Sequence, residues 1–464
     1  MSLLAKKGIK LTEHSIPSRM TENDRRSFEV SPLLNEGRVS MTPSEEEEVD
    51  ILAAAPAICS RKKKGPQWQN CRATFCCCTS KKARIILCLL VILLPILSFT
   101  LFCSIYFSAA SLPTDTIPLD QVSSLQQTTT APRLLTFNMF MRPPGIKNNK
   151  DDFKNERLEY IVQNILPHYD IITVQEAFAY ANRRIDTLLS AAFAQGFYYH
   201  VASARHYPWH LAGDGGLLIL SRFPIKKSNR IEFSRGVHSD WLSFKGALHA
   251  LIELNPTQHI HVYTTHTQAS YDNGGAINFD DTKVRLSQFA AVHQFISDTA
   301  KNDTHPILLM GDLNVDAATH DDVIEQPSRH NSLAYTMMMD VLTGKGTRLD
   351  LIDNKTSSET VYASDWKLND LTDIAYKTYG YHPITFGDYK KLDNGSLVPA
   401  ETTLTSHNQL MTVQSIDRLL WSSNNNTHIS IGNLTVEPFF TSNETNQPFT
   451  QISDHYGLSA LLYL

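Results

Sequence analysis

The chain contains no cysteine beyond residue 103. A segment without cysteine can form neither a disulfide nor a thiolate metal site, so both are excluded from the large C-terminal part of the chain. The cysteines all lie nearer the N-terminus, at Cys59, Cys71, Cys76, Cys77, Cys78, Cys88 and Cys103.

Positive charge is also scarce in the C-terminal part. Residues 1–84 hold 15 Lys and Arg against 10 Asp and Glu, which leaves 27 basic and 37 acidic residues in the rest of the chain. An acidic domain repels polyanions at long range. The charge distribution therefore argues against a nucleic-acid partner.

Charged residues are absent altogether from residues 85–110, which read IILCLLVILLPILSFTLFCSIYFSAA. About 20 apolar residues in a helix cross a bilayer core of ~30 Å. The run is too long and too far from Met1 for the core of a signal peptide, and it has no polar face. We predict a transmembrane helix over residues 85–110.

The charges that flank this run differ in sign. On the far side the first charged residues are Asp115 and Asp120, whereas the near side carries Arg61, Lys62, Lys63, Lys64, Arg72, Lys81, Lys82 and Arg84. The positive-inside rule places the N-terminus in the cytosol and residues 111–464 in a lumen or outside the cell.

Glycosylation sequons lie on one side only. None precedes the apolar run, and six follow it, at Asn302, Asn354, Asn394, Asn425, Asn433 and Asn443. N-glycans are added to luminal segments, so the sequons support the same single-pass type II orientation.

The segments around the span have biased compositions. Residues 1–84 contain the acidic run Glu45–Glu48 and no sustained periodicity, which predicts a disordered cytosolic tail. Residues 111–131 are rich in Ser and Thr and predict a polar stalk. The cluster Cys76–Cys78 lies just before the span and predicts reversible acylation rather than a zinc site, because it lacks paired CxxC elements and a nearby histidine.

Residues 132–464 predict one domain of short strands and amphipathic helices. The expected strands are 134–140, 170–176, 215–221, 246–254, 259–267, 305–313, 415–421 and 456–464, and the expected helices are 155–165, 183–194 and 282–297. Strands outnumber helices, and many alternate apolar with polar residues. This pattern favours two packed sheets with helices outside.

Polar side chains capable of phosphoryl chemistry lie at or near the ends of these strands. They are Asn138, Glu176, His266, Asp312, Asn314, Asp417, Asp454 and His455. Hard oxygen ligands bind Mg²⁺, which neutralises phosphate charge, and imidazole moves a proton.

These residues stand in six short motifs whose order is characteristic: FN, QE, TH, GDLN, IDR and SDH. In these motifs the chain resembles the endonuclease/exonuclease/phosphatase superfamily, typified by pancreatic deoxyribonuclease, over residues 133–464. The resemblance implies a four-layer α/β sandwich with two packed central mixed sheets.

The resemblance also implies a metal site and its ion. Glu176 would be the principal ligand of Mg²⁺, with Mn²⁺ as the alternative ion. The remaining residues of the implied metal site are Asn138, Asp312, Asn314 and Asp454.

The same resemblance implies catalytic roles. His455 would be the general base, held by the carboxylate of Asp417. Asp312 and Asn314 would orient the attacking water and bind phosphate, and His266 would stabilise or protonate at phosphorus.

Within the superfamily, residues 236–270 look most like neutral sphingomyelinases, in which a KG strand leads into a strand that ends in TH-x-QA. Lys245, His266 and Gln268 stand at those positions. The implied substrate is sphingomyelin, a membrane phospholipid, and the products would be ceramide and phosphocholine.

Three alternatives remain. An inositol-polyphosphate 5-phosphatase shares GDLN and DRxLW, but Val315 and Asp316 follow GDLN here. A nuclease conflicts with the acidic charge. A non-catalytic ectodomain would require losses among the site residues, and none is seen.

Overall fold

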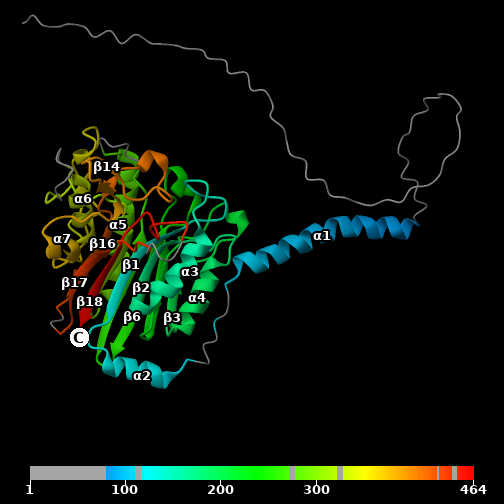
Figure 1. Ribbon diagram of the computed structural model, residues 1–464, viewed down its shortest axis with the longest axis horizontal. Coiled ribbons are helices and arrows are strands. Elements are labelled where there is room, and N and C mark those ends of the chain that lie inside the picture. The colour runs from blue at the N-terminus through cyan, green and yellow to red at the C-terminus, as the bar shows by residue number, and fades with distance from the viewer. Residues whose placement is uncertain are drawn as a thin grey trace, which may run out of the picture. The chain divides into compact units, whose positions relative to one another are not determined.

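The computed structural model describes residues 80–109, 112, 117–270, 277–320, 328–425, 428–441 and 447–464 (Figure 1). The predicted cytosolic tail up to residue 79, the Cys76–Cys78 cluster and the sequon at Asn443 lie outside the described residues.

Two six-stranded sheets form the centre of the domain. The first has the order β17-β18-β1-β2-β4-β3, in which only β1 and β2 run parallel. Its strands are β1 (Arg133–Met141), β2 (Ile171–Ala177), β3 (Tyr199–Ala202), β4 (Leu218–Ser221), β17 (Ser430–Glu437) and β18 (Gly457–Tyr463).

The second sheet has the order β11-β16-β8-β7-β6-β5, in which only β7 and β8 run parallel. Its strands are β5 (Ile225–Glu232), β6 (Gly246–Asn255), β7 (Gln258–His266), β8 (Ile307–Asp312), β11 (Thr372–Asp373) and β16 (Asp417–Ser422). Short strand pairs lie outside both sheets: β9 (Thr347–Arg348) with β10 (Thr360–Val361), β12 (Phe386–Gly387) with β15 (Val413–Gln414), and β13 (Tyr389–Lys391) with β14 (Leu397–Pro399).

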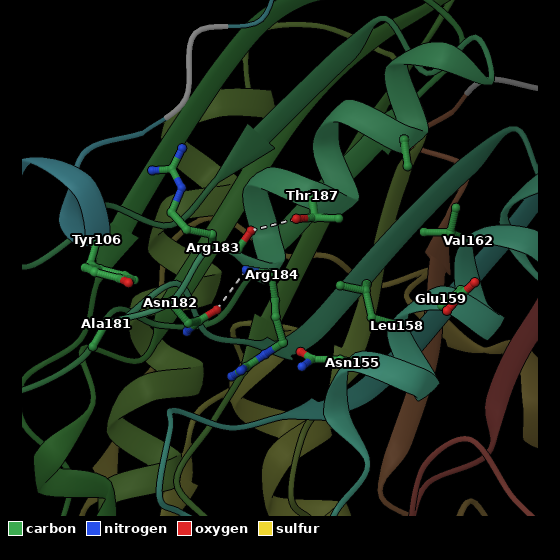
Figure 2. Close-up of a pocket in the computed structure, with 11 residues that line it drawn as sticks. Tyr106, Asn155, Leu158, Glu159, Val162, Ala181, Asn182, Arg183, Arg184 and Thr187 are labelled. Carbon is green, nitrogen blue, oxygen red and sulfur yellow. Dashed lines mark hydrogen bonds between the residues drawn. The ribbon is translucent and has the colours of Figure 1, made fainter. Parts of the chain in front are cut away.

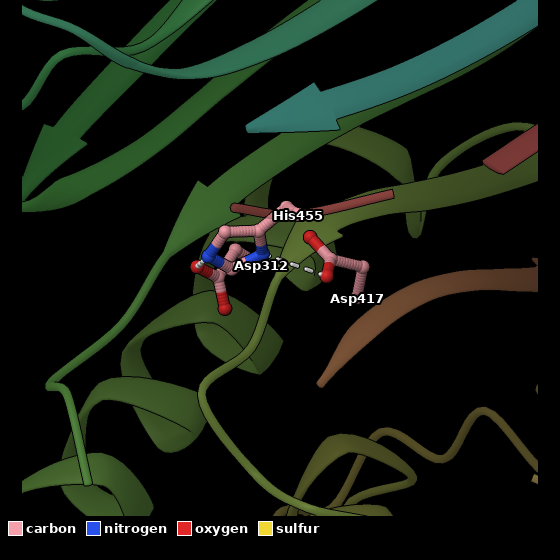
Figure 3. A group of neighbouring side chains, drawn as sticks. All are labelled: Asp312, Asp417 and His455. Carbon is pink, nitrogen blue, oxygen red and sulfur yellow. Dashed lines mark hydrogen bonds and ion pairs between the residues drawn. The ribbon is translucent and has the colours of Figure 1, made fainter. Parts of the chain in front are cut away.

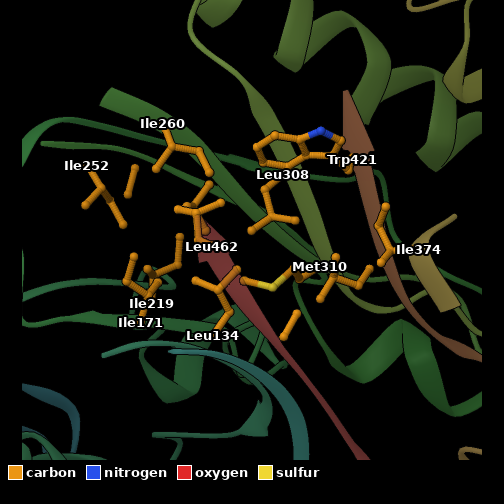
Figure 4. Close-up of a cluster of buried hydrophobic side chains, with 14 of the residues drawn as sticks. Leu134, Ile171, Ile219, Ile252, Ile260, Leu308, Met310, Ile374, Trp421 and Leu462 are labelled. Carbon is orange, nitrogen blue, oxygen red and sulfur yellow. The ribbon is translucent and has the colours of Figure 1, made fainter. Parts of the chain in front are cut away.

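An apolar core joins the facing sides of the two sheets (Figure 4). Leu134 and Ile171 from the first sheet share this cluster with Ile252, Leu308 and Met310 from the second, and all are fully buried. Full burial of such a side chain stabilises a fold by about 1.5–3 kcal/mol. This core holds the ends of β1 and β8 in fixed positions, and both strands carry site residues.

Helices cover the outer faces. Helices α3 (Lys154–Asn164) and α4 (Arg184–Ala194) bury Leu158 and Leu188 in a second core with β1 and β2. Helices α5 (Phe279–Ala300) and α6 (Leu333–Leu342) do the same against β7 and β8, and α7 (Ile374–Tyr379) is short. The layers are helices, sheet, sheet and helices, so the predicted four-layer α/β sandwich is confirmed.

Helix α1 (Lys81–Phe107) covers residues 85–107 of the predicted span and ends before residue 110. It begins four residues before the predicted span, where Ser80 accepts a hydrogen bond from the backbone N–H of Ala83 at 3.3 Å. It is long and apolar enough to cross a membrane. Pro95 lies inside it.

The segment predicted as a stalk contains a helix that the sequence analysis did not foresee, α2 (Leu119–Thr128). Val122 is buried, Leu125 packs against the core between the sheets, and Gln126 donates to the backbone carbonyl of Glu253 at 3.1 Å. Part of this segment therefore lies against the domain.

Candidate active site

Strand register brings most of the predicted site together. Asp312 ends β8 and pairs in register with Asp417 of β16 on one side and with His266 of β7 on the other. Asn138 reaches the same place from β1 of the first sheet, and His455 from the segment before β18. All five side chains are buried.

A carboxylate–imidazole pair lies at the centre (Figure 3). His455 donates through Nδ1 to Oδ2 of Asp417 at 2.9 Å. Its other ring nitrogen, Nε2, lies 3.8 Å from Oδ2 of Asp312 and 3.4 Å from Nδ2 of Asn138. Asp417 therefore fixes the ring orientation and leaves Nε2 directed toward the remaining polar groups.

The charges of this centre are strongly coupled. Burial alone would lower the pKa of His455, but Asp417 and Asp312 outweigh it and raise that pKa to about 10. Burial raises the pKa of Asp312 to about 7, although the neighbouring His455 opposes the shift. Without further positive charge in the site, the imidazole therefore holds its proton at neutral pH.

Hydrogen bonds fix Asp312 on both oxygens. Its Oδ2 accepts from Nδ2 of Asn138 at 3.0 Å, and its Oδ1 accepts from the backbone N–H of Asn314 at 2.9 Å. Asn314 has a φ of 48°, in the left-handed region, and its Nδ2 donates to the carbonyl of Thr267 at 3.0 Å. Asparagine adopts this backbone region more readily than other non-glycine residues, and these hydrogen bonds hold it there.

His266 is held by a residue to which the sequence analysis gave no role. The Nζ of Lys245, which is buried, lies 2.8 Å from Oδ2 of Asp240, 2.6 Å from the carbonyl of Thr267 and 3.2 Å from Nε2 of His266. Burial, and then the positive Lys245 and His455, hold the pKa of His266 well below its usual range. A neutral His266 that accepts from Lys245 carries its hydrogen on Nδ1, which has no partner among the described residues.

Glu176 and Asp454 form a second acidic group. Glu176 lies near the end of β2 with a φ of 53°, and its Oε2 is buried without a hydrogen-bond partner in the described part of the chain. Burial and the charge of Glu176 raise the pKa of Asp454 to about 6, against the opposing effect of His455. A partnerless buried carboxylate oxygen beside a second carboxylate fits a hard divalent cation such as Mg²⁺.

A second place for a metal follows from distance alone. One ligand atom each from Asp312, Asp417 and His455 lies within 4.8 Å of the other two. The hydrogen bond between His455 and Asp417 accounts for much of this closeness. Glu176 with Asp454 is the better fit to a cation, because of these two groups it is the one that has a buried carboxylate oxygen without a hydrogen-bond partner among the described residues.

Further residues that the sequence analysis missed hold the site in place. Arg157 of α3 is fully buried and donates to the carbonyls of Met139 and Ile452 at 2.9 and 2.8 Å, which ties β1 to the segment before His455. Ser453 donates to the carbonyl of Asn138 at 2.7 Å. Arg157 belongs to none of the six motifs, so no sequence signal identified it.

A cavity of about 590 Å³ lies away from this centre (Figure 2). It is lined mainly by α3, α4 and the turn before α4, including Asn155, Leu158, Val162, Arg183, Arg184 and Thr187. None of the eight predicted site residues lines it, so it is separate from the chemistry described above.

A buried histidine oriented by one carboxylate and facing another, together with an unpaired glutamate oxygen near Asp454, is suited to metal-assisted hydrolysis of phosphoric esters. The sequence family described as the Endonuclease/Exonuclease/phosphatase family matches residues 135–455. The chain belongs to this family.

The chain is also similar to individual proteins and to a solved structure. A sphingomyelinase of Dictyostelium discoideum is 27% identical over 472 residues, which cover 72% of this chain and 98% of that protein. A phospholipase C of Staphylococcus aureus is 29% identical over 198 residues, which cover 40% of this chain and 58% of that protein. The solved structure of Staphylococcus aureus beta toxin matches with a TM-score of 0.45 at 20% identity and covers 71% of this chain and 99% of that one.

Proposed function

We propose that this protein is a Mg²⁺-dependent phosphodiesterase that hydrolyses sphingomyelin to ceramide and phosphocholine. The observation that carries the chemistry is the array of Asp417, His455 and Asp312, together with the unpaired oxygen of Glu176 near Asp454. The sphingomyelin-like substrate is supported by the similarity to a named sphingomyelinase over nearly the whole of that relative.

In this proposal each site residue has its own chemical role. His455, oriented by Asp417, takes a proton at Nε2 from the water that attacks phosphorus, and Asp312 aligns that water. The bond between phosphorus and the ceramide oxygen breaks, and that oxygen takes up a proton from solvent, so that ceramide leaves and phosphocholine remains. Asn314 and the neutral His266 bind the phosphoryl oxygens. Bound Mg²⁺ would supply positive charge that neutralises the phosphate and lowers the pKa of His455. Glu176 would hold this ion, together with Asp454.

The first prediction concerns the substrate. We expect the full chain in detergent micelles with Mg²⁺ to release phosphocholine from sphingomyelin, and EDTA to abolish the release. The assay is run in parallel on lysophosphatidylcholine, a phosphoinositide and DNA. Activity on the phosphoinositide alone would indicate a 5-phosphatase, and activity on DNA alone would indicate a nuclease. Inactivity on all substrates would favour a non-catalytic ectodomain.

We also propose that the protein is a type II membrane protein whose domain is luminal or extracellular and glycosylated. The five sequon asparagines within the described residues are all exposed, as glycan attachment requires: Asn302, Asn354, Asn394, Asn425 and Asn433.

The second prediction tests this orientation. Removal of N-glycans is expected to lower the apparent mass of the protein from cells, and replacement of the sequon asparagines by Gln should remove that shift. Protease added to sealed microsomes is expected to spare residues 132–464. Digestion of that domain in intact vesicles would show that the domain faces the cytosol and that the proposed orientation is wrong.

A further inference from the structure

Four large apolar side chains are exposed on two neighbouring turns of the domain. Trp209 and Leu211 belong to the turn around the short helix η3 (Pro208–His210), with 60% and 68% of their surface exposed. Trp241 and Leu242 belong to η4 (His238–Leu242), with 47% and 55% exposed. We call these four residues the apolar patch. Clustered exposed side chains of this size mark an interaction surface.

The two turns lie side by side because polar contacts fasten them. Arg235 donates to the carbonyl of Trp241 at 2.7 Å and to the carbonyl of His210 at 3.1 Å. The backbone N–H of Gly213 donates to the carbonyl of Leu242 at 2.9 Å. The side chains are therefore presented together by a fixed framework.

Leu211 is both exposed and in a backbone conformation that leucine rarely adopts. Its φ is 54°, in the left-handed region that favours glycine and asparagine over leucine. An apolar side chain in this position is unfavourable both for the backbone and for contact with water. The unfavourable position is explained if the side chain contacts something other than water.

The patch is continuous with the end of helix α1. The ring of Phe107, the last residue of that helix, lies 6.1 Å from the ring of Tyr207, and Tyr207 stacks on Trp209 at 4.6 Å. Arg205 donates to the carbonyl of Ser108 at 3.1 Å. Where α1 crosses a bilayer, Trp209 thus lies two ring contacts from the point at which the chain leaves it.

We propose that the apolar patch inserts into the membrane that α1 crosses. It would enter the interfacial layer of the membrane face on which the domain lies. Tryptophan and leucine are the side chains that peripheral segments bury at the boundary between headgroups and acyl chains. Arg235, whose guanidinium lies 5.1 Å from the ring centre of Trp241, supplies a positive charge at headgroup depth. We take the partner to be a phospholipid surface rather than a protein, because the patch adjoins the end of the helix that crosses the membrane.

The patch also connects with the site. Asp240, next to Trp241, accepts from the Nζ of Lys245, which contacts His266. A membrane that holds η4 consequently lies near the catalytic centre. This part of the proposal rests on the proposed lipid hydrolase function, whereas insertion of the patch rests on α1 crossing the membrane.

The insertion is tested with the full chain in phosphatidylcholine vesicles. Brominated phosphatidylcholine is expected to quench the tryptophan fluorescence of the unchanged protein, and the double variant Trp209→Phe, Trp241→Phe should lose most of that quenching. Equal quenching in both proteins would overturn the proposal. This measurement needs no catalytic activity, so its failure is distinct from failure of the proposed function.

The consequence for turnover is tested with Trp209→Ser, Trp241→Ser and with Leu211→Asn, which suits the left-handed backbone and keeps the fold. We expect hydrolysis of sphingomyelin in vesicles to fall about tenfold or more, since each exposed side chain loses its apolar contact. Hydrolysis of a water-soluble phosphodiester should stay unchanged. Leu351→Ser, at a leucine 48% exposed outside the patch, is the matched control. Unchanged vesicle hydrolysis in the patch variants, or an equal loss on both substrates, would contradict the proposal.

Discussion

Replacement of His455 by alanine is expected to remove phosphodiester hydrolysis almost completely. No other described side chain combines a ring nitrogen hydrogen-bonded to a buried carboxylate with a second nitrogen directed toward Asp312. A positioned general base contributes about 10²–10⁴-fold to rate, so a loss in that range is expected. The measurement is phosphocholine release from sphingomyelin at saturating Mg²⁺.

The alanine variant should also lose stability. His455 is buried between Asp417 and Asp312, and its removal leaves two neighbouring carboxylates without their counter-charge. Loss of one partner from a buried pair costs about 3–5 kcal/mol, reduced here because Asp312, with a pKa near 7, readily takes up a proton. We expect a lower melting temperature for the alanine variant.

Two further variants separate the chemical effect from the structural one. His455→Gln keeps a hydrogen-bond donor near Asp417 and should recover stability without activity. Asp417→Asn should lose less activity than either, because the imidazole remains but its orientation is disturbed. Near-normal turnover in His455→Gln would exclude His455 as the base.

Replacement of Glu176 by glutamine is expected to abolish the stabilisation of the protein by Mg²⁺. Oε2 of Glu176 has no hydrogen-bond partner in the described structure, so it is available to bind the ion. An amide in its place lacks the negative charge that Mg²⁺ prefers in a ligand. A ligand at 100 times its Kd stabilises by about 2.7 kcal/mol, so the unchanged protein should show a clear rise in melting temperature with Mg²⁺.

The same variant should not weaken the metal-free protein. Glu176 raises the pKa of the neighbouring Asp454, and its neutralisation relieves that repulsion. We therefore expect an equal or higher melting temperature in EDTA, together with at least a tenfold higher Mg²⁺ requirement for activity. Glu159→Gln, at an exposed glutamate of α3, is the control. A normal Mg²⁺ response in Glu176→Gln would indicate that the metal binds instead at the group of Asp312, Asp417 and His455.

Much of the fold follows from local patterns. All eight strands predicted from apolar runs correspond to strands of the two sheets, and the three predicted helices correspond to α3, α4 and α5. Strand β5 was missed because it is an edge strand that exposes most of its side chains, and its KKSNR run carries no apolar alternation. Helix α2 was missed because its short sequence, LDQVSSLQQT, is polar and depends on packing against the domain.

The site could be predicted as a set of residues but not as a geometry. Motifs at strand ends identified Asn138, His266, Asp312, Asp417 and His455, and the structure brings these five side chains together. The roles assigned to them, and the metal ligands, stay predictions. Lys245 was quoted from the sequence without a function, since only the folded chain places its Nζ against His266.

The sequence by itself determined eight strands of the two sheets, three helices, the apolar segment and the residue types of the site, because periodicity and short motifs are local properties of the chain. The tertiary structure alone decided that Lys245 lies against His266, which glutamate oxygen stays unpaired, and that Trp209 and Trp241 lie on adjoining turns. These relations depend on the register of distant strands and on the burial of charge between two sheets. Neither is encoded in the spacing of residues along the chain.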